Sequence, residues 1–344
     1  MTERMLRKFA WPAVFSFVLA LPLLAAALAP LRAEEAAPAP QAQPAAKAEP
    51  AGKTAPAAKP AAPAAARPRP VPEDLEYIRD VEYGKGGGRA LRLDILRPKQ
   101  PPAQPMPVVV YIHGGAWRGG SRAAMPLLCN RLAQEGYFCA SIEYRLSQES
   151  PFPAQIEDCK CAIRFLRARA KEYNINPDRI GVWGHSAGGH LVALLGTSGD
   201  AKDLEGTGGW QDQSSRVQAV LDCFGPADFT IIPKWAEGIQ EQMKGPVYQL
   251  LGGPVAENAE KAAKASPITH VSKDDPPILI MHGDQDFVVP LDQSVRLAEA
   301  LKKAGVDVTL HVVKGAGHGF RGQEIEDMTA AFFDKHLKGR AVKP

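Results

Sequence analysis

The chain lacks the sequence motifs of several common protein classes. It has no phosphate-binding P-loop and no G-x-G-x-x-G between a predicted strand and a helix, so a nucleotide cofactor has no backbone cradle. Its five cysteines include no C-x-x-C pair and no histidine at zinc-finger spacing, and we expect no metal. Residues 73–344 carry 32 basic and 34 acidic side chains, which leaves no basic surface for nucleic acid. We therefore expect neither a cofactor nor a nucleic-acid partner.

The amino terminus has the pattern of an export signal. Three basic residues within the first eight precede an uncharged run of 17 residues from Ala13 to Ala29, and small residues follow. This pattern is typical of a secretory signal peptide, which we place at residues 1–33 with cleavage near Ala29 or Ala33. The alternative is a retained membrane anchor, since 17 residues is at the lower limit for a spanning helix. The sequence predicts a secreted or periplasmic protein, membrane-tethered if the segment is not cleaved.

The next segment, residues 34–72, has almost no large apolar side chains. Its 39 residues include 16 alanines and 10 prolines, and Val71 is its only large apolar residue. Recurring proline interrupts helix, and without apolar side chains no core can form. We expect a disordered, semi-rigid linker whose basic residues allow a loose association with an anionic envelope surface. The folded catalytic domain is then residues 73–344.

The cysteines are Cys129, Cys139, Cys159, Cys161 and Cys223. An exported protein can form disulfides, but the number is odd, and Cys159 and Cys161 point apart on a predicted helix. We interpret these residues chiefly as small buried side chains, with one or two bridges at most.

Apolar β-branched runs alternate with amphipathic stretches through this domain. The predicted strands are 81–83, 91–96, 108–112, 137–143, 179–183, 217–224, 277–281 and 308–313. The predicted helices are 122–134, 154–173, one from 187 onward, 291–304 and 325–337. This order predicts an α/β fold with a mostly parallel twisted sheet and helices on both faces. Ligands bind such sheets at the carboxyl ends of the strands, so the loops that follow the strands are the candidate site.

The loop after strand 179–183 reads GHSAGG, with Ser186 as its third residue. This is G-x-S-x-G at a strand-to-helix junction, where small residues permit a sharp turn and expose the serine hydroxyl at a helix amino terminus. The sequence therefore predicts Ser186 as a nucleophile. The alternative interpretation is an ordinary glycine-rich junction.

A serine nucleophile needs a base and an orienting carboxylate. His318 lies in a glycine-rich loop after strand 308–313, and two acids, Asp284 and Asp286, follow strand 277–281. Asp284 lies in the turn itself and is expected to accept local backbone amides. We therefore predict Ser186, Asp286 and His318 as the triad, in the chain order of α/β-hydrolases.

Attack on an ester carbonyl also requires donors for the oxyanion. The loop after strand 108–112 reads HGGAW, from His113 to Trp117. We predict an oxyanion hole formed by the backbone N–H of Ala187 with those of Gly114 and Gly115, or with those of Gly115 and Ala116. One such donor typically lowers the barrier by about 2.7–4 kcal/mol.

With these loops, the sequence resembles the α/β-hydrolases of the carboxylesterase group, near the hormone-sensitive-lipase-like esterases and closer to the bacterial feruloyl and acetyl-xylan esterase-like branch. The matching stretches are 113–117, 144–146, 151–154, 178–189, 214–217, 266–270, 282–290 and 317–319. The resemblance spans about residues 81–337 and implies the α/β-hydrolase fold and the same triad. In two places the chain departs from the hormone-sensitive-lipase pattern: Ala116 stands in place of a third glycine, and His185 in place of an acid before the serine.

The predicted function is a secreted or periplasmic serine carboxylesterase acting on short-chain or carbohydrate-linked acetyl or feruloyl esters, either small molecules or polysaccharides. The alternatives are a serine peptidase of the prolyl-oligopeptidase kind and a catalytically inert binding module. The remaining histidines have structural interpretations: His113 orders the HGGAW loop, His282 bonds backbone, and His185 and His190 do not form a metal pattern.

A cap or insert around residues 199–266 is the expected specificity element. Its stretch 229–264 would cover the carboxyl edge of the sheet. The rings of Trp210, Trp235 and Tyr248 either stack on a sugar or aromatic acyl group or pack the cap itself.

Overall fold

The computed structural model describes residues 71–235 and 237–339. The predicted signal peptide and all but the last two residues of the predicted linker lie outside these ranges. Within the described residues, none of the helices has both the length and the apolar character needed to cross a membrane. Val71, the last large apolar side chain of the linker, packs against buried residues of the folded domain.

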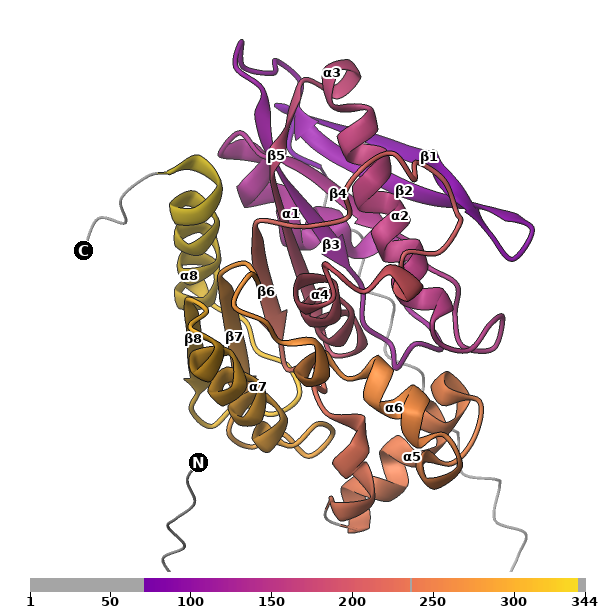
Figure 1. Cartoon of the computed structure of the whole chain (residues 1–344). Coiled ribbons are helices and arrows are strands. Elements are labelled where there is room, and N and C mark those ends of the chain that lie inside the picture. Colours follow the sequence, from indigo (N-terminus) through magenta and orange to yellow (C-terminus); the bar gives the residue numbers. More distant parts are fainter. Residues whose placement is uncertain (1–70, 236, 340–344) are drawn as a thin grey trace, which may run out of the picture. The chain divides into compact units, whose positions relative to one another are not determined.

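The described residues form one sheet of eight strands (Figure 1). The strands are β1 (Leu75–Gly86), β2 (Arg89–Pro98), β3 (Met106–Ile112), β4 (Phe138–Ile142), β5 (Ile175–His185), β6 (Ala219–Cys223), β7 (Ile278–Gly283) and β8 (Val308–Val313). Their order is β1-β2-β4-β3-β5-β6-β7-β8, in which β1, β2 and β4 pair antiparallel and all other pairs are parallel. The predicted α/β class with a mostly parallel sheet is confirmed.

The α-helices connect the strands and cover both faces. They are α1 (Met125–Gln134), α2 (Ala154–Ala168), α3 (Ala170–Tyr173), α4 (Ala187–Thr197), α5 (Glu237–Leu251), α6 (Ala259–Ala265), α7 (Leu291–Ala304) and α8 (Gln323–Phe333). Short 3₁₀ segments lie at Arg122–Ala124, Lys202–Leu204, Phe229–Lys234, Val255–Glu257 and Pro267–His270, and a π-helical turn at Asp334–Lys338 follows α8.

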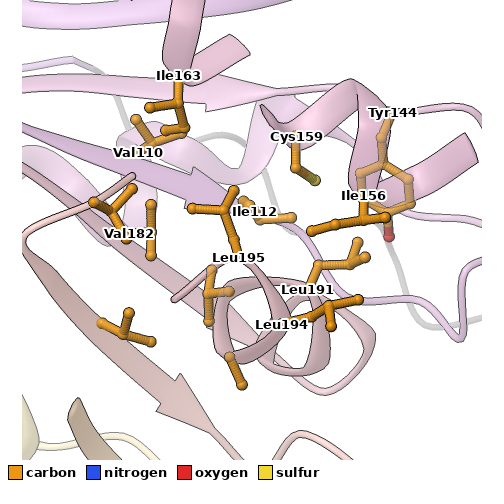
Figure 2. Close-up of a cluster of buried hydrophobic side chains, with 14 of the residues drawn as sticks. Val110, Ile112, Tyr144, Ile156, Cys159, Ile163, Val182, Leu191, Leu194 and Leu195 are labelled. Carbon is orange, nitrogen blue, oxygen red and sulfur yellow. The ribbon is translucent and has the colours of Figure 1, made fainter. Parts of the chain in front are cut away.

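Alternate residues of the central strands enter two different cores. Val108, Val110 and Ile112 of β3 pack with α2, α4 and α7, whereas Val109 and Tyr111 pack with α1 and α8. Figure 2 shows the first core, where strand side chains meet those of α2 and α4. Because helices cover both faces, the whole of β3 is buried, as its continuous apolar run predicted.

The sequence prediction differs from the structure mainly at element ends. The predicted helix 154–173 is two helices, because α2 ends at Ala168 and α3 begins at Ala170. The predicted helix 122–134 begins with a 3₁₀ turn, and the predicted pair 81–83 and 91–96 is part of a much longer hairpin, β1 with β2. The hairpin extends because backbone pairing continues, with two register shifts, through polar residues that periodicity does not mark.

All five cysteines are free and buried. The interpretation as small core side chains is confirmed, and the alternative of one or two bridges is wrong. Cys139 Sγ makes a weak contact with the carbonyl oxygen of Cys129, 3.9 Å away.

The predicted cap divides into two stretches. Residues 199–216 lie along β1 and α2, where Lys85 N–H donates to the Gly208 carbonyl and Trp210 Nε1–H donates to the Tyr83 carbonyl. Residues 229–270 follow the carboxyl end of β6, and their helices α5 and α6 lie beyond its arrowhead in Figure 1. Trp210, Trp235 and Tyr248 all pack against the first core, so packing accounts for these three rings.

Candidate active site

Ser186 stands at a sharp turn between β5 and α4. Its backbone has φ 55° and ψ −120°, a conformation that a non-glycine residue rarely adopts. The turn is held by Ser186 N–H, which donates to the Cys223 carbonyl at the end of β6 (2.9 Å), and by the helical bond from His190 N–H to the Ser186 carbonyl. The side chain is half-buried and therefore reachable at the carboxyl edge of the sheet.

The glycines around Ser186 are required by close backbone contacts. A Cβ on Gly184 would lie 2.2 Å from the Gly188 carbonyl oxygen, and one on Gly188 would lie 2.0 Å from the Ile112 carbonyl oxygen. No real Cβ tolerates such distances, so the strand, the turn and the helix approach this closely only without side chains. The small residues of GHSAGG therefore permit the sharp strand-to-helix turn that the motif predicted.

The structure brings Ser186 together with His318 and Asp286. His318 Nε2 lies 2.9 Å from Ser186 Oγ, and His318 Nδ1 lies 2.7 Å from Asp286 Oδ2. The three residues come from the loops after β5, β8 and β7. In the tautomer with the proton on Nδ1, the ring donates to the carboxylate and accepts the serine proton, as nucleophilic catalysis requires.

Asp286 is buried, and both of its carboxylate oxygens have hydrogen-bond partners. Its Oδ1 accepts the backbone N–H groups of Val288 and Val289 at 2.8 and 2.9 Å, and His282 Nε2 lies 3.2 Å from its Oδ2. Burial by itself raises the pKa of Asp286, but hydrogen bonds from His282 and His318 outweigh it and hold the pKa well below its ordinary value. The carboxylate is therefore ionised wherever His318 must act as a base.

From the sequence, His282 was expected to form a hydrogen bond with backbone. It does contact the Val289 carbonyl (2.9 Å), and its Nδ1 lies 2.7 Å from Ser294 Oγ, but it also borders the acid of the candidate triad. Its position four residues before Asp286 was the available signal. Asp284 accepts from Gly315 N–H at 2.6 Å, a backbone amide as predicted, but one that lies 31 residues away and not in the local turn. The local amides, those of Val288 and Val289, donate to Asp286 instead.

The HGGAW loop lies directly against the serine turn. A Cβ on Gly114 would be 2.6 Å from the His185 carbonyl oxygen and 3.3 Å from Ser186 Cβ. Among residues 71–235 and 237–339, the N–H groups of Gly114, Gly115 and Ala116 have no hydrogen-bond acceptor. Ala187 is the first residue of α4, where an N–H has no intrahelical partner. These N–H groups are the predicted oxyanion donors; Gly114 lies against the serine turn, and Ala187 directly follows Ser186.

Ala116 and Trp117 occupy the left-handed region, with φ of 54° and 57°. Glycine adopts this region freely, whereas for other residues this conformation is less favourable by roughly 1–2 kcal/mol. This backbone geometry explains why the hormone-sensitive-lipase pattern has a third glycine at this position. Ala116 adopts a left-handed conformation here, although it is less favourable for alanine than for glycine. The loop needs other contacts to hold it.

Two histidines supply such contacts. The His113 ring stacks on Tyr144 with a centroid distance of 4.5 Å, and the Tyr144 hydroxyl donates to the His113 carbonyl at 3.0 Å. Burial lowers the pKa of His113, so its ring is neutral at neutral pH. His113 therefore orders the loop, in agreement with its predicted role.

His190 links three parts of the site. Trp117 Nε1–H donates to His190 Nδ1 (3.1 Å), and His190 Nε2 donates to the Ala265 carbonyl (2.7 Å) at the end of α6. Burial lowers the pKa of His190 to about 4, so the ring stays neutral and its Nδ1 can accept. A neutral His190 therefore joins the HGGAW loop to the serine helix and to the segment after β6.

We expect His190→Leu to lower kcat by about 100-fold with little change in KM, because displacement of the HGGAW loop weakens the oxyanion donors rather than ester binding. Trp117→Phe removes the same hydrogen bond from its other end. If the two residues act through this bond, the double variant should have the same kcat in steady-state assays as the single variant with the lower kcat. Strictly additive losses would show that the bond does not carry the effect.

The sheet order, its two helical layers and the serine turn define an α/β-hydrolase. The chain belongs to the BD-FAE family, whose model matches residues 93–301.

Named relatives and solved structures agree with this assignment. The Mycobacterium tuberculosis protein named probable carboxylic ester hydrolase LipM is 34% identical over 67% of this chain and 53% of its own length. A carbohydrate esterase from gut microbiota, solved in truncated form, is 34% identical with a TM-score of 0.68, covering 76% of this chain and 96% of that one. The propionate-bound esterase Est2 of Thermogutta terrifontis is 28% identical with a TM-score of 0.61, covering 75% and 91%. The chain spans 53–64% of the length of the first three curated relatives that it matches.

Proposed function

We propose that this protein is a serine carboxylic ester hydrolase that uses Ser186, His318 and Asp286, with oxyanion donors from Gly114, Gly115 and Ala187. The observation that carries the proposal is the pair of hydrogen bonds in series, 2.9 Å from Ser186 to His318 and 2.7 Å from His318 to Asp286. The esterase names of its relatives support the same reaction.

The proposed reaction is a two-step acyl transfer. Ser186 Oγ attacks the ester carbonyl as His318 Nε2 takes its proton, and the backbone N–H groups stabilise the oxyanion. The tetrahedral intermediate expels the alcohol, which takes the proton from His318. Water then attacks the acyl-serine, with His318 again accepting and returning the proton, and the carboxylic acid leaves. Asp286 holds the ring in the required tautomer and stabilises its charged form.

The proposed substrates are short-chain or carbohydrate-linked esters, including acetyl and feruloyl esters. Support comes from a solved relative at 34% identity that is named a carbohydrate esterase. We further propose that the enzyme acts outside the cytoplasm, because residues 1–33 have the pattern of an export signal and residues 34–72 that of a linker.

An ester panel tests this function. We expect purified protein to hydrolyse 4-nitrophenyl acetate faster than longer acyl esters, and to release acid from acetylated xylan or methyl ferulate. Peptide amides with a short acyl group are the comparison, and we expect at least 100-fold slower cleavage of them. Preferential amide cleavage would favour the peptidase alternative, and inertness toward every ester would favour a binding module.

A further inference from the structure

A groove begins beside His318 and runs along the sheet face that α1 and α8 cover. It consists of two adjoining hollows of about 510 and 280 Å³. The hollows share Leu128, His185, Phe320 and Arg321. The larger hollow is also lined by Phe224, whose ring packs edge-on against His318 with a centroid distance of 4.7 Å. The larger hollow therefore lies next to the base of the proposed triad, separated from it by the Phe224 ring.

The walls of the larger hollow are mainly aromatic. Tyr111, Phe224 and Phe320 line it, and the last two pack edge-on with centroids 5.3 Å apart. Aromatic faces of this kind suit a planar or sugar ring. His185 also lines the hollow, but burial, with Arg321 and His318 adding to it, lowers its pKa to about 4. His185 is therefore uncharged at neutral pH.

Arg321 brings an unmatched positive charge to both hollows. It is exposed, and within residues 71–235 and 237–339 it has neither an ion pair nor a side-chain hydrogen bond. Arg131, which lines the smaller hollow, differs in this respect because it pairs with Glu135 (2.9 Å) and Asp327 (2.6 Å). Glu326 lines only the smaller hollow and does not pair with Arg321. A guanidinium with free donors is the usual partner of a carboxylate.

The position of the groove next to His318 indicates which half of an ester, acyl or alcohol, it contacts. Gly319, Phe320 and Arg321 line it and directly follow His318, which must hand its proton to the leaving oxygen. The alcohol half of the substrate therefore lies on this side.

We propose that the groove binds the alcohol half of the ester and that Arg321 recognises a carboxylate on it. The ligand class is a ring that bears a carboxylate, such as an acylated uronic acid unit. This inference rests on the proposed ester hydrolysis and adds the substrate class.

Matched acetate esters test the inference. The anionic probe is 4-acetoxybenzoate and its neutral counterpart is 4-acetoxybenzamide, with each kcat/KM divided by the rate of hydroxide-catalysed hydrolysis to remove leaving-group effects. We expect the wild type to favour the benzoate three- to fivefold at low salt, since exposed ion pairs are weak, and to lose the preference at about 0.5 M NaCl. Arg321→Gln removes the preference, whereas Arg131→Gln, the matched control, keeps it.

Several results would overturn the inference. Equal corrected rates in the wild type, or an unchanged preference in Arg321→Gln, would exclude recognition by Arg321. A preference for anionic acyl groups instead, measured with mono-4-nitrophenyl glutarate against 4-nitrophenyl valerate, would place the anion on the wrong half of the ester. Failure of the wild type to hydrolyse any of these esters would instead contradict the proposed function itself.

Discussion

Ser186→Ala is expected to lower kcat for 4-nitrophenyl acetate by about 10⁴-fold or more, because without the hydroxyl no acyl-enzyme can form. The alanine has no added atoms, and the φ of 55° at this position is no harder for alanine than for serine. We therefore expect an unchanged melting temperature and circular dichroism spectrum. Activity within tenfold of the wild type in this folded variant would remove Ser186 from the mechanism.

Asp286→Asn is expected to lower kcat by about 10⁴-fold with a smaller effect on KM. The amide cannot stabilise the imidazolium, and its NH₂ group favours the wrong tautomer of His318. Asp284→Asn is the matched control, because it changes the other acid of the same loop. Among the described residues, the hydrogen-bond donor to the Asp284 carboxylate is Gly315 N–H, 31 residues away, so we expect less than about tenfold loss in kcat there.

Steady-state kinetics on the two variants show whether Asp286 or Asp284 is the acid of the triad. A large loss for Asp284→Asn with a small loss for Asp286→Asn would reverse them. Equal losses in both, with lowered melting temperatures, would mean that the loop and not one carboxylate is needed.

Much of this site could be predicted from sequence because its chemistry is encoded locally. The GHSAGG turn must be small where strand and helix meet, and the loops after parallel strands necessarily share one edge of the sheet. Asp286 was favoured over Asp284 because acids in a turn usually bond nearby backbone. In the structure Asp286 accepts the nearby N–H groups and Asp284 a distant one, so this rule does not explain the choice. The rules for the GHSAGG turn and for the loops after parallel strands need no knowledge of distant packing.

The remaining features depend on contacts between distant segments. The bond between Trp117 and His190 joins residues 73 positions apart, and nothing in the sequence around either residue indicates the other. The same holds for the left-handed conformation of Ala116 and for the groove at Arg321, which forms only where α1, α8 and the loop after β8 come together. The full length of the β1–β2 hairpin was not predicted, because polar residues continue its backbone pairing beyond 81–83 and 91–96.

The central claim is that Ser186 is the activated nucleophile of the site, and covalent labelling tests it most directly. The wild-type protein is treated with a fluorophosphonate, digested and mapped by peptide mass spectrometry, with His318→Ala as a control that should label far more slowly. The account predicts one modified residue, Ser186, and loss of esterase activity in proportion to its labelling. Stoichiometric labelling at another residue, or full activity in protein labelled at Ser186, would contradict it.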